Sequence, residues 1–313
     1  MKTAFIFPGQ GSQAVGMGKA LYDTYPEARA VFDAADDALG EKLSTLCFEG
    51  PEEALKLTAN TQPAILTVSV AAHAVFSKRF GAAPAFVAGH SLGEYSALVA
   101  AEALSLADAV RAVRARGTFM QQAVPQGVGA MAAVLGLAPE KVKEICDAVA
   151  EGQVVAPANY NDPQQTVIAG HAEAVERASA KLKEAGAKRV VALPVSAPFH
   201  CALMQPVVAQ LAQVLSKVTF ATPRFPVVSN VEAAPNQDAA RIAELLLRQV
   251  TGSVRWVECV QALEKEGVTQ VFELGPGKVL CGLVRRISKT LQSAGVEDPA
   301  SLEKALAPPK VPS

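Results

Sequence analysis

The stretch that decides the fold is FVAGHSLGEYSAL, residues 86–98. Its first three residues are an apolar run suited to a buried strand, and residues 92–104 are rich in Leu, Ala and Glu, which favours a helix. The Gly-His-Ser-Leu-Gly between them, at 89–93, matches the Gly-x-Ser-x-Gly turn that exposes a serine oxygen at the end of a strand. A Cβ at either glycine would crowd this strained turn. We therefore predict that Ser91 is a nucleophile and that the backbone N–H of Leu92, at a helix N-terminus, stabilises an oxyanion.

The composition excludes several classes of function. The chain has 313 residues, 50% of them hydrophobic, which is enough for one large domain with an insertion or for two domains. Its 29 basic and 30 acidic residues are balanced, so there is no basic field for nucleic acid. No apolar run is long enough to cross a membrane, and the apolar stretch before Pro8 is too short for a signal peptide.

The cysteines indicate a cellular compartment. There are five, and they are scattered without the pair spacing of a metal or redox site. This usage fits a reducing environment, so we expect a cytoplasmic protein. We also expect no metal and no bound cofactor.

The order of the predicted elements indicates an α/β fold with two parts. We expect a large α/β-hydrolase-like domain with a mostly parallel sheet, made of residues 1–126 and 198–313. Residues 127–197 have the order strand, helix, strand, strand, helix, strand, which is the split βαβ or ferredoxin-like arrangement. We interpret them as a small subdomain inserted into the large domain. The tail from residue 299 is expected to be loose.

A serine hydroxyl needs a general base, and the chain has four histidines to supply one. His200 is the strongest candidate, because two prolines frame its loop at the exit from the small subdomain, and catalytic groups gather in such loops. His73 lies in an apolar helical stretch and suits a packed or surface position, whereas His171 follows a strand and suits a turn. His90 adjoins Ser91, but consecutive side chains in such a turn point apart, so we expect it to shape the site.

Other groups could complete the site. No loop aspartate between Ser91 and His200 stands out as the group that orients the imidazole, so a backbone carbonyl or an amide could serve instead. Arg116 falls at the edge of an apolar helical stripe, and two interpretations stay open: its stem covers the core, or its guanidinium grips a carboxylate. The glycine-rich turn around Gln10 is a weak phosphate loop and a better source of a second oxyanion N–H. Cys201 is a weak rival nucleophile because it lacks an elbow.

Five short motifs occur in one order along the chain. They are FPGQGSQ at 7–13, GHSLGEY at 89–95, RG at 116–117, PFH at 198–200 and ELGPG at 273–277. Together they resemble the malonyl-CoA:acyl-carrier-protein transacylases of fatty-acid synthesis. The resemblance covers nearly the whole chain, and the combination is specific although each motif alone is not.

The resemblance implies ping-pong acyl transfer. Ser91 would accept the acyl group from malonyl-CoA, and His200 would be its base and later its acid. Arg116 would bind the free malonyl carboxylate. The phosphopantetheine thiol of acyl carrier protein would then take the malonyl group. The implied substrate and partner are therefore malonyl-CoA and acyl carrier protein, and we expect the enzyme to be a monomer.

The resemblance also assigns supporting residues. Gln10 and Leu92 would supply the N–H groups of the oxyanion hole. Gln249 would orient the histidine through its backbone carbonyl, which would explain the missing aspartate. Phe199 resembles the residue at this position in malonyl-type acyltransferase domains of polyketide synthases, where many free-standing bacterial members carry a small residue. Its ring would narrow the acyl pocket and disfavour a methyl branch.

Alternative functions stay open at this point. A serine esterase or thioesterase would use the same elbow with water as the acceptor and would not depend on Arg116. An acyltransferase that supplies polyketide synthesis would share the chemistry and serve another pathway. A non-catalytic module that docks carrier protein would keep the fold and form no acyl-enzyme.

Overall fold

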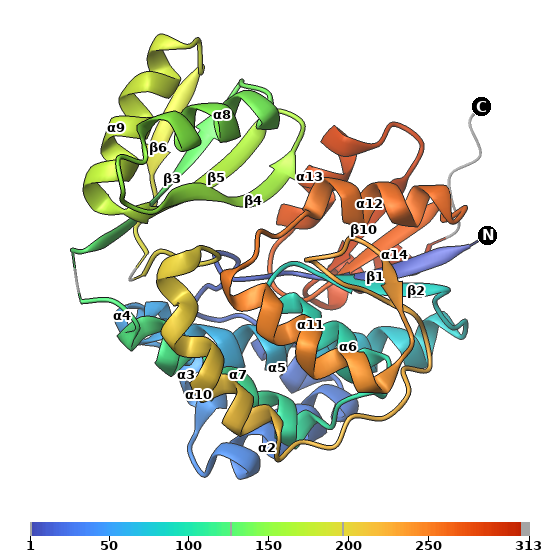
Figure 1. Cartoon of the computed structure of the whole chain (residues 1–313). Helices are drawn as coiled ribbons and strands as arrows, with labels where there is room; N and C mark the ends of the chain where they lie inside the picture. Colours follow the sequence, from blue (N-terminus) through green and yellow to red (C-terminus); the bar gives the residue numbers. More distant parts are fainter. Residues whose placement is uncertain (1, 126, 196, 308–313) are drawn as a thin grey trace.

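A six-stranded sheet lies at the centre of the larger part of the molecule (Figure 1). The computed structural model describes residues 2–125, 127–195 and 197–307. The strands of this sheet are β1 (Thr3–Phe7), β2 (Phe86–Gly89), β7 (Val227–Val228), β8 (Pro235–Asn236), β9 (Gln270–Leu274) and β10 (Gln292–Val296). Their order is β10-β9-β1-β2-β7-β8, and every neighbouring pair is parallel except β7 and β8. The predicted mixed α/β fold with a parallel-rich sheet is confirmed.

Helices cover both faces of this sheet. They are α1 (Lys19–Thr24), α2 (Pro26–Leu39), α3 (Leu43–Glu49), α4 (Glu52–Lys56), α5 (Thr58–Phe80), α6 (Gly93–Ala100), α7 (Leu106–Gln122), the short 3₁₀ helix η1 (Ala202–Met204), α10 (Gln205–Leu215), α11 (Ala239–Thr251), α12 (Trp256–Lys265), α13 (Val279–Ile287) and α14 (Pro299–Leu306). Within the described part of the chain, none of them is both long and apolar enough to cross a membrane.

Strand β1 divides the core into two layers. Successive side chains of a strand point to opposite faces. Phe5 and Phe7 therefore pack on one face with α5 and α7, whereas Ile6 packs on the other with Trp256 of α12 and Val284 of α13. Because both faces are covered, β1, β2 and β9 are buried at every position. This is why β1 and β2 are mostly apolar and do not alternate, whereas β9 also buries the polar residues Gln270 and Glu273.

A second, four-stranded sheet forms the smaller part of the molecule. In chain order, this part of the molecule consists of β3 (Gly129–Leu135), α8 (Pro139–Val149), β4 (Val155–Asp162), β5 (Gln165–His171), α9 (Ala172–Glu184) and β6 (Arg189–Ala192). The strand order is β4-β5-β3-β6, and all pairs are antiparallel. Helices α8 and α9 pack on it around a separate apolar cluster. The element order is the one that the sequence predicts.

The small sheet is joined to the larger part of the molecule by backbone pairing. Asn159 of β4 forms a parallel bridge with Val254, in the connection between α11 and α12. The N–H of Tyr160 donates to the carbonyl of Val254 at 2.9 Å, and the N–H of Val254 donates to the carbonyl of Ala158 at 2.8 Å. Strand β4 therefore lies directly against the segment that follows α11.

The C-terminal tail differs from the sequence prediction. Residues 292–296 form the edge strand β10, and residues 299–306 form α14 where a loose tail was expected. Asp298 caps this helix, because its side chain accepts a hydrogen bond from the N–H of Ser301 at 2.7 Å and the Ser301 hydroxyl accepts one from the N–H of Asp298 at 3.0 Å. Of the predicted loose tail, only residues 308–313 lie outside the described part of the chain.

Candidate active site

Ser91 lies on a sharp turn between β2 and α6. Its φ of 53° is in the left-handed region, which costs energy for a residue with a side chain. A Cβ on Gly89 would lie 1.9 Å from the carbonyl carbon of Gly93, and a Cβ on Gly93 would lie 2.1 Å from the carbonyl oxygen of Phe7. The turn can therefore form only because both positions are glycine. The elbow occurs as the sequence predicts.

His200 contacts both Ser91 and Gln249. Its Nδ1–H donates to the backbone carbonyl of Gln249 at 2.9 Å, which leaves Nε2 as the acceptor for the Ser91 hydroxyl at 2.7 Å. Burial, together with the nearby charge of Arg116, lowers the pKa of His200 to about 3, although the hydrogen bond to Gln249 acts in the opposite direction. The imidazole is therefore neutral at physiological pH and can accept a proton from the serine.

Arg116 reaches the same serine from α7. Its Nη2 donates to Ser91 Oγ at 3.2 Å and to Gln249 Oε1 at 2.9 Å, and its Nη1 donates to Gln62 Oε1 at 2.8 Å. The residue is 1% exposed, so it is more deeply buried than its place at the edge of the stripe suggests. Gly117 allows this depth, because a Cβ there would lie 2.6 Å from a backbone carbonyl oxygen of α5.

Of the two predicted oxyanion donors, Leu92 lies in the elbow and Gln10 lies on a turn beside it. Leu92 is the N-cap residue of α6, so its N–H belongs to the free N-terminal end of that helix. The turn that carries Gln10 packs against the elbow, since a Cβ on Gly9 would lie 2.5 Å from the carbonyl oxygen of His90. The side chain of Gln10 donates to the hydroxyl of Thr58 at 3.3 Å and is thereby held beside the site.

The other candidate residues have structural contacts. Phe199 is buried in the main core, directly before the histidine. Burial raises the pKa of the Cys201 thiol to about 11, and its Sγ lies 3.1 Å from the carbonyl of Pro198, so it is not a poised nucleophile. His90 Nε2 lies 2.8 Å from Asn161 Oδ1 of β4, a contact that suits a residue that shapes the site.

The remaining two histidines lie away from the serine. The ring of His73 packs edge-on against Phe5 and Phe7, which agrees with a packed position. The Nδ1 of His171, at the end of β5, accepts a hydrogen bond from the N–H of Val154 at 2.9 Å. Both therefore have the structural roles that the sequence favours.

Three buried polar residues around the site were missed by sequence reasoning. Gln62 holds the Arg116 guanidinium, Asn230 accepts the N–H of Ser91 at 2.7 Å, and Glu94 accepts the Gln249 side-chain amide at 2.8 Å. Gln62 and Asn230 carry no local signal. Glu94 lies within the elbow motif, but an acid in the first turn of a helix is also expected on grounds of helix stability.

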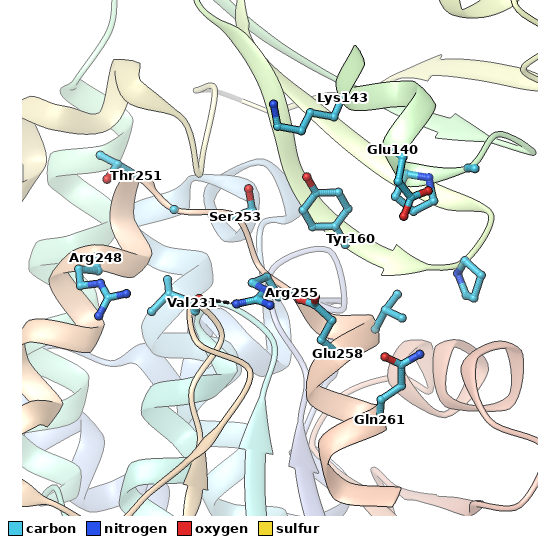
Figure 2. Close-up of a pocket in the computed structure, with 15 residues that line it drawn as sticks. Glu140, Lys143, Tyr160, Val231, Arg248, Thr251, Ser253, Arg255, Glu258 and Gln261 are labelled. Carbon is cyan, nitrogen blue, oxygen red and sulfur yellow. Dashed lines mark hydrogen bonds and ion pairs between the residues drawn. The ribbon is translucent and has the colours of Figure 1, made fainter. Parts of the chain in front are cut away.

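A cleft lies between the two parts of the molecule, and the catalytic groups are not among the residues that line it. Figure 2 shows its lining, which comes from α8 and β4 on one side and from α11 and α12 on the other. Its volume is about 1010 Å³. Its arginines are already engaged, because Arg255 pairs with Glu258 and Arg248 pairs with Glu232. Among the described residues, no group of three or more His, Cys, Asp or Glu is placed to hold a metal ion.

Comparisons with known proteins agree with the geometry. The family model described as "Acyl transferase domain" matches residues 4–304. The chain belongs to the acyl transferase family. A relative from Salmonella typhimurium, named malonyl CoA-acyl carrier protein transacylase, is 51% identical over 303 residues, which are 97% of this chain and 98% of the relative. A Bacillus subtilis relative of the same name is 51% identical over 306 residues, 97% of this chain and 96% of its own.

Solved structures show the same family. The malonyl-transacylase of a type II polyketide synthase, in complex with its holo acyl-carrier protein, has a TM-score of 0.95 at 49% identity and covers 98% of this chain and 99% of its own. The acyl carrier protein S-malonyltransferase of Vibrio cholerae also has a TM-score of 0.95, at 48% identity, and covers 97% of this chain and 100% of its own. The resemblance carried by the five sequence motifs is therefore confirmed.

Proposed function

We propose that this chain transfers the malonyl group of malonyl-CoA to the phosphopantetheine thiol of acyl carrier protein, through a malonyl ester on Ser91. The observation that carries this proposal is the meeting of three groups at one oxygen. Ser91 Oγ lies 2.7 Å from a neutral imidazole nitrogen of His200 and 3.2 Å from a guanidinium nitrogen of Arg116. A nucleophile, its base and a cation for a substrate carboxylate are thus within reach of one acyl group.

Acylation of the serine begins with proton transfer. His200 Nε2 takes the hydroxyl proton as Ser91 Oγ attacks the thioester carbonyl, and the backbone N–H groups of Gln10 and Leu92 stabilise the oxyanion. Loss of one such donor would raise the barrier by ~3–4 kcal/mol. The tetrahedral intermediate then collapses, the bond from carbon to sulfur breaks, and the imidazolium returns its proton to the departing CoA thiolate. The carbonyl of Gln249 keeps the imidazole in the required tautomer.

Arg116 selects an acyl group that carries its own carboxylate. A guanidinium offers five N–H donors in a planar fork that matches a carboxylate. Gln62 and Gln249 hold this fork in place and engage only part of its donors. An uncharged acyl group would leave the buried cation without a negative group in direct contact, since Glu94 reaches it only through Gln249. Selection therefore follows from electrostatics in a site that excludes water.

Transfer to carrier protein is the reverse of the first step with a different thiol. The phosphopantetheine thiol gives its proton to His200 and attacks the malonyl ester, and Ser91 leaves as a hydroxyl. The relatives that are named malonyl CoA-acyl carrier protein transacylase support fatty-acid synthesis as the pathway. The similar transacylase of a polyketide synthase supports polyketide supply as the second candidate.

Phe199 favours malonyl over methylmalonyl groups in this proposal. The residue is buried in the main core and directly precedes the catalytic histidine in the chain. One extra methyl group in such a pocket is worth ~1–3 kcal/mol, so the preference is real but limited.

The domain division, the oligomeric state and the cellular compartment belong to the same proposal. Residues 1–126 and 198–313 form an α/β-hydrolase-like domain, and residues 127–197 form a ferredoxin-like subdomain. The topologies of the two sheets support this division. We further propose a monomer that needs no bound cofactor and works in the cytoplasm, where the five free thiols would stay reduced.

One experiment separates this function from its alternatives. The protein is mixed with malonyl-CoA and its intact mass is measured, with S91A as the control. We expect a stable malonyl adduct in the wild type and none in S91A. Brief acylation with release of free malonate would instead show a hydrolase. The absence of any adduct would show a module without catalysis.

A further inference from the structure

Glu94 is a buried carboxylate to which the acyl transfer described above gives no role. It lies in the first turn of α6, just after the nucleophile, and is 3% exposed. One of its oxygens, Oε2, accepts two hydrogen bonds, from Gln249 Nε2 at 2.8 Å and from the backbone N–H of Asn230 at 3.0 Å. Each of these partners in turn holds a group of the reaction.

The Gln249 side chain connects Glu94 to Arg116. Its Nε2 donates to Glu94, and its Oε1 accepts from Arg116 Nη2 at 2.9 Å. An amide has donors on one side and an acceptor on the other, so Glu94 Oε2 and the backbone carbonyl of Ser91, which accepts from the same Nε2 at 3.0 Å, together fix which way it faces. With the amide reversed, its NH₂ group would meet the guanidinium, donor against donor. The same residue's backbone carbonyl orients His200.

Asn230 connects Glu94 to the nucleophile. Its Oδ1 accepts the N–H of Ser91 at 2.7 Å, and its Nδ2 donates to the carbonyl of Gly89 at 2.7 Å. These two bonds hold the ends of the strained turn, in which Ser91 has a φ of 53°. The Asn230 backbone is itself fixed by its bond to Glu94.

We propose that Glu94 is a positioning residue whose Oε2 aligns Arg116 and His200 through Gln249, and the Ser91 turn through Asn230. This inference rests on the proposed malonyl transfer. In this proposal, one oxygen helps to fix the relative positions of Arg116, His200 and Ser91.

The role requires an acceptor oxygen and not a negative charge. Burial raises the pKa of Glu94 to about 7, while the hydrogen bonds from Asn230 and Gln249 and the charge of Arg116 lower it. Near neutral pH the group is thus partly protonated, and a protonated carboxyl still has an oxygen that accepts. Because Oε2 takes both hydrogen bonds, the single carbonyl oxygen of a glutamine can replace it.

Two conservative variants separate the oxygen from the charge. E94Q keeps an acceptor at the same reach and removes the charge, whereas E94D keeps the charge and withdraws the oxygen by one methylene group. The matched control is E273D. Glu273 is also fully buried and accepts two backbone N–H groups, from Leu280 at 3.0 Å and Cys281 at 2.7 Å, away from the site.

For each variant, acylation by malonyl-CoA and by acetyl-CoA is followed by intact mass. The rate is expressed per molecule of protein that can be acylated. In E94D we expect kcat/KM for malonyl-CoA to fall about 100-fold, the loss that a small misplacement of a reacting group causes. We also expect its preference for malonyl over acetyl to fall about tenfold, because Arg116 loses a charge-assisted hydrogen bond. E94Q should stay within about threefold of the wild type in both measures. E273D should keep the wild-type preference.

Two results would overturn the inference. If E94D keeps the wild-type preference, Glu94 only supports packing. If E94D is more active than E94Q, the charge matters and the oxygen does not. Failure of the proposed function is distinguishable from both, because the wild type itself would then form no malonyl-Ser91 ester.

Discussion

Replacing Glu94 by glutamine should stabilise the protein at alkaline pH and leave its stability unchanged at acidic pH. Burial raises the pKa of this carboxyl from 4.5 to about 7. Between these values the folded chain binds more protons than the unfolded chain, so the wild-type free energy of unfolding falls as the pH rises. The difference between the two pKa values corresponds to about 3 kcal/mol at pH values above both. Glutamine does not ionise, so E94Q avoids this cost.

The effect is large enough to see in thermal melts. An unfolding entropy of about 2.1 cal/mol/K per residue for 313 residues converts 3 kcal/mol into a rise in Tm of about 5 °C. The Tm of E94Q and of the wild type is measured by circular dichroism from about pH 5 to about pH 9. We expect the difference to grow with pH. Parallel curves, or an E94Q variant that is the less stable protein at alkaline pH, would refute the reasoning.

Further predictions follow from other contacts. Because burial holds the pKa of His200 at about 3, the acylation rate in quenched-flow measurements should stay level from about pH 8 to about pH 5; a midpoint near the ordinary histidine pKa would contradict this. G89A should prevent folding, because its Cβ would lie 1.9 Å from the Gly93 carbonyl carbon, whereas G282A in α13, with 3.8 Å of clearance, should raise the free energy of unfolding in urea by about 0.5–1 kcal/mol. F199S should raise kcat/KM for methylmalonyl-CoA relative to malonyl-CoA by about tenfold, and an unchanged ratio would remove the ring from the specificity argument. Burial raises the pKa of all five thiols, so Ellman's reagent should titrate none in the native protein and five in urea.

The elbow could be predicted from sequence because its chemistry is local. Gly89 and Gly93 restrict the turn, a strand precedes it and a helix follows, and all of this lies within a few residues. His200 was found by elimination among four histidines, helped by the prolines around it. The α/β order of elements was readable for the same reason, since each element depends mainly on its own pattern.

The polar network behind the serine could not be predicted, because it depends on contacts between distant segments. Glu94 and Asn230 are 136 residues apart in the chain. Helical periodicity places Arg116 at a stripe edge but gives no sign that Gln62 of another helix closes over it. Gln249 was assigned only through the family resemblance, since a buried glutamine has no pattern that separates it from an exposed one.

The C-terminal tail was missed for a different physical reason. Strand β10 reads QSAGV, which lacks both alternation and a strong apolar run, because it is an edge strand with partly exposed side chains. The following helix depends on the cap at Asp298, and its proline at the first position suits a helix start as well as a loop. Composition favoured the loop.

The bridge between Asn159 and Val254 determines which segments could be exchanged between this protein and its relatives. Val254 lies only a few residues after Gln249. The same short backbone segment therefore pairs with strand β4 and carries the carbonyl that orients His200. A chimaera that exchanges only residues 127–197 would import a strand whose partner segment comes from another protein. The segments that must be exchanged together are therefore discontinuous in the sequence: residues 249–255 should be replaced along with the small sheet.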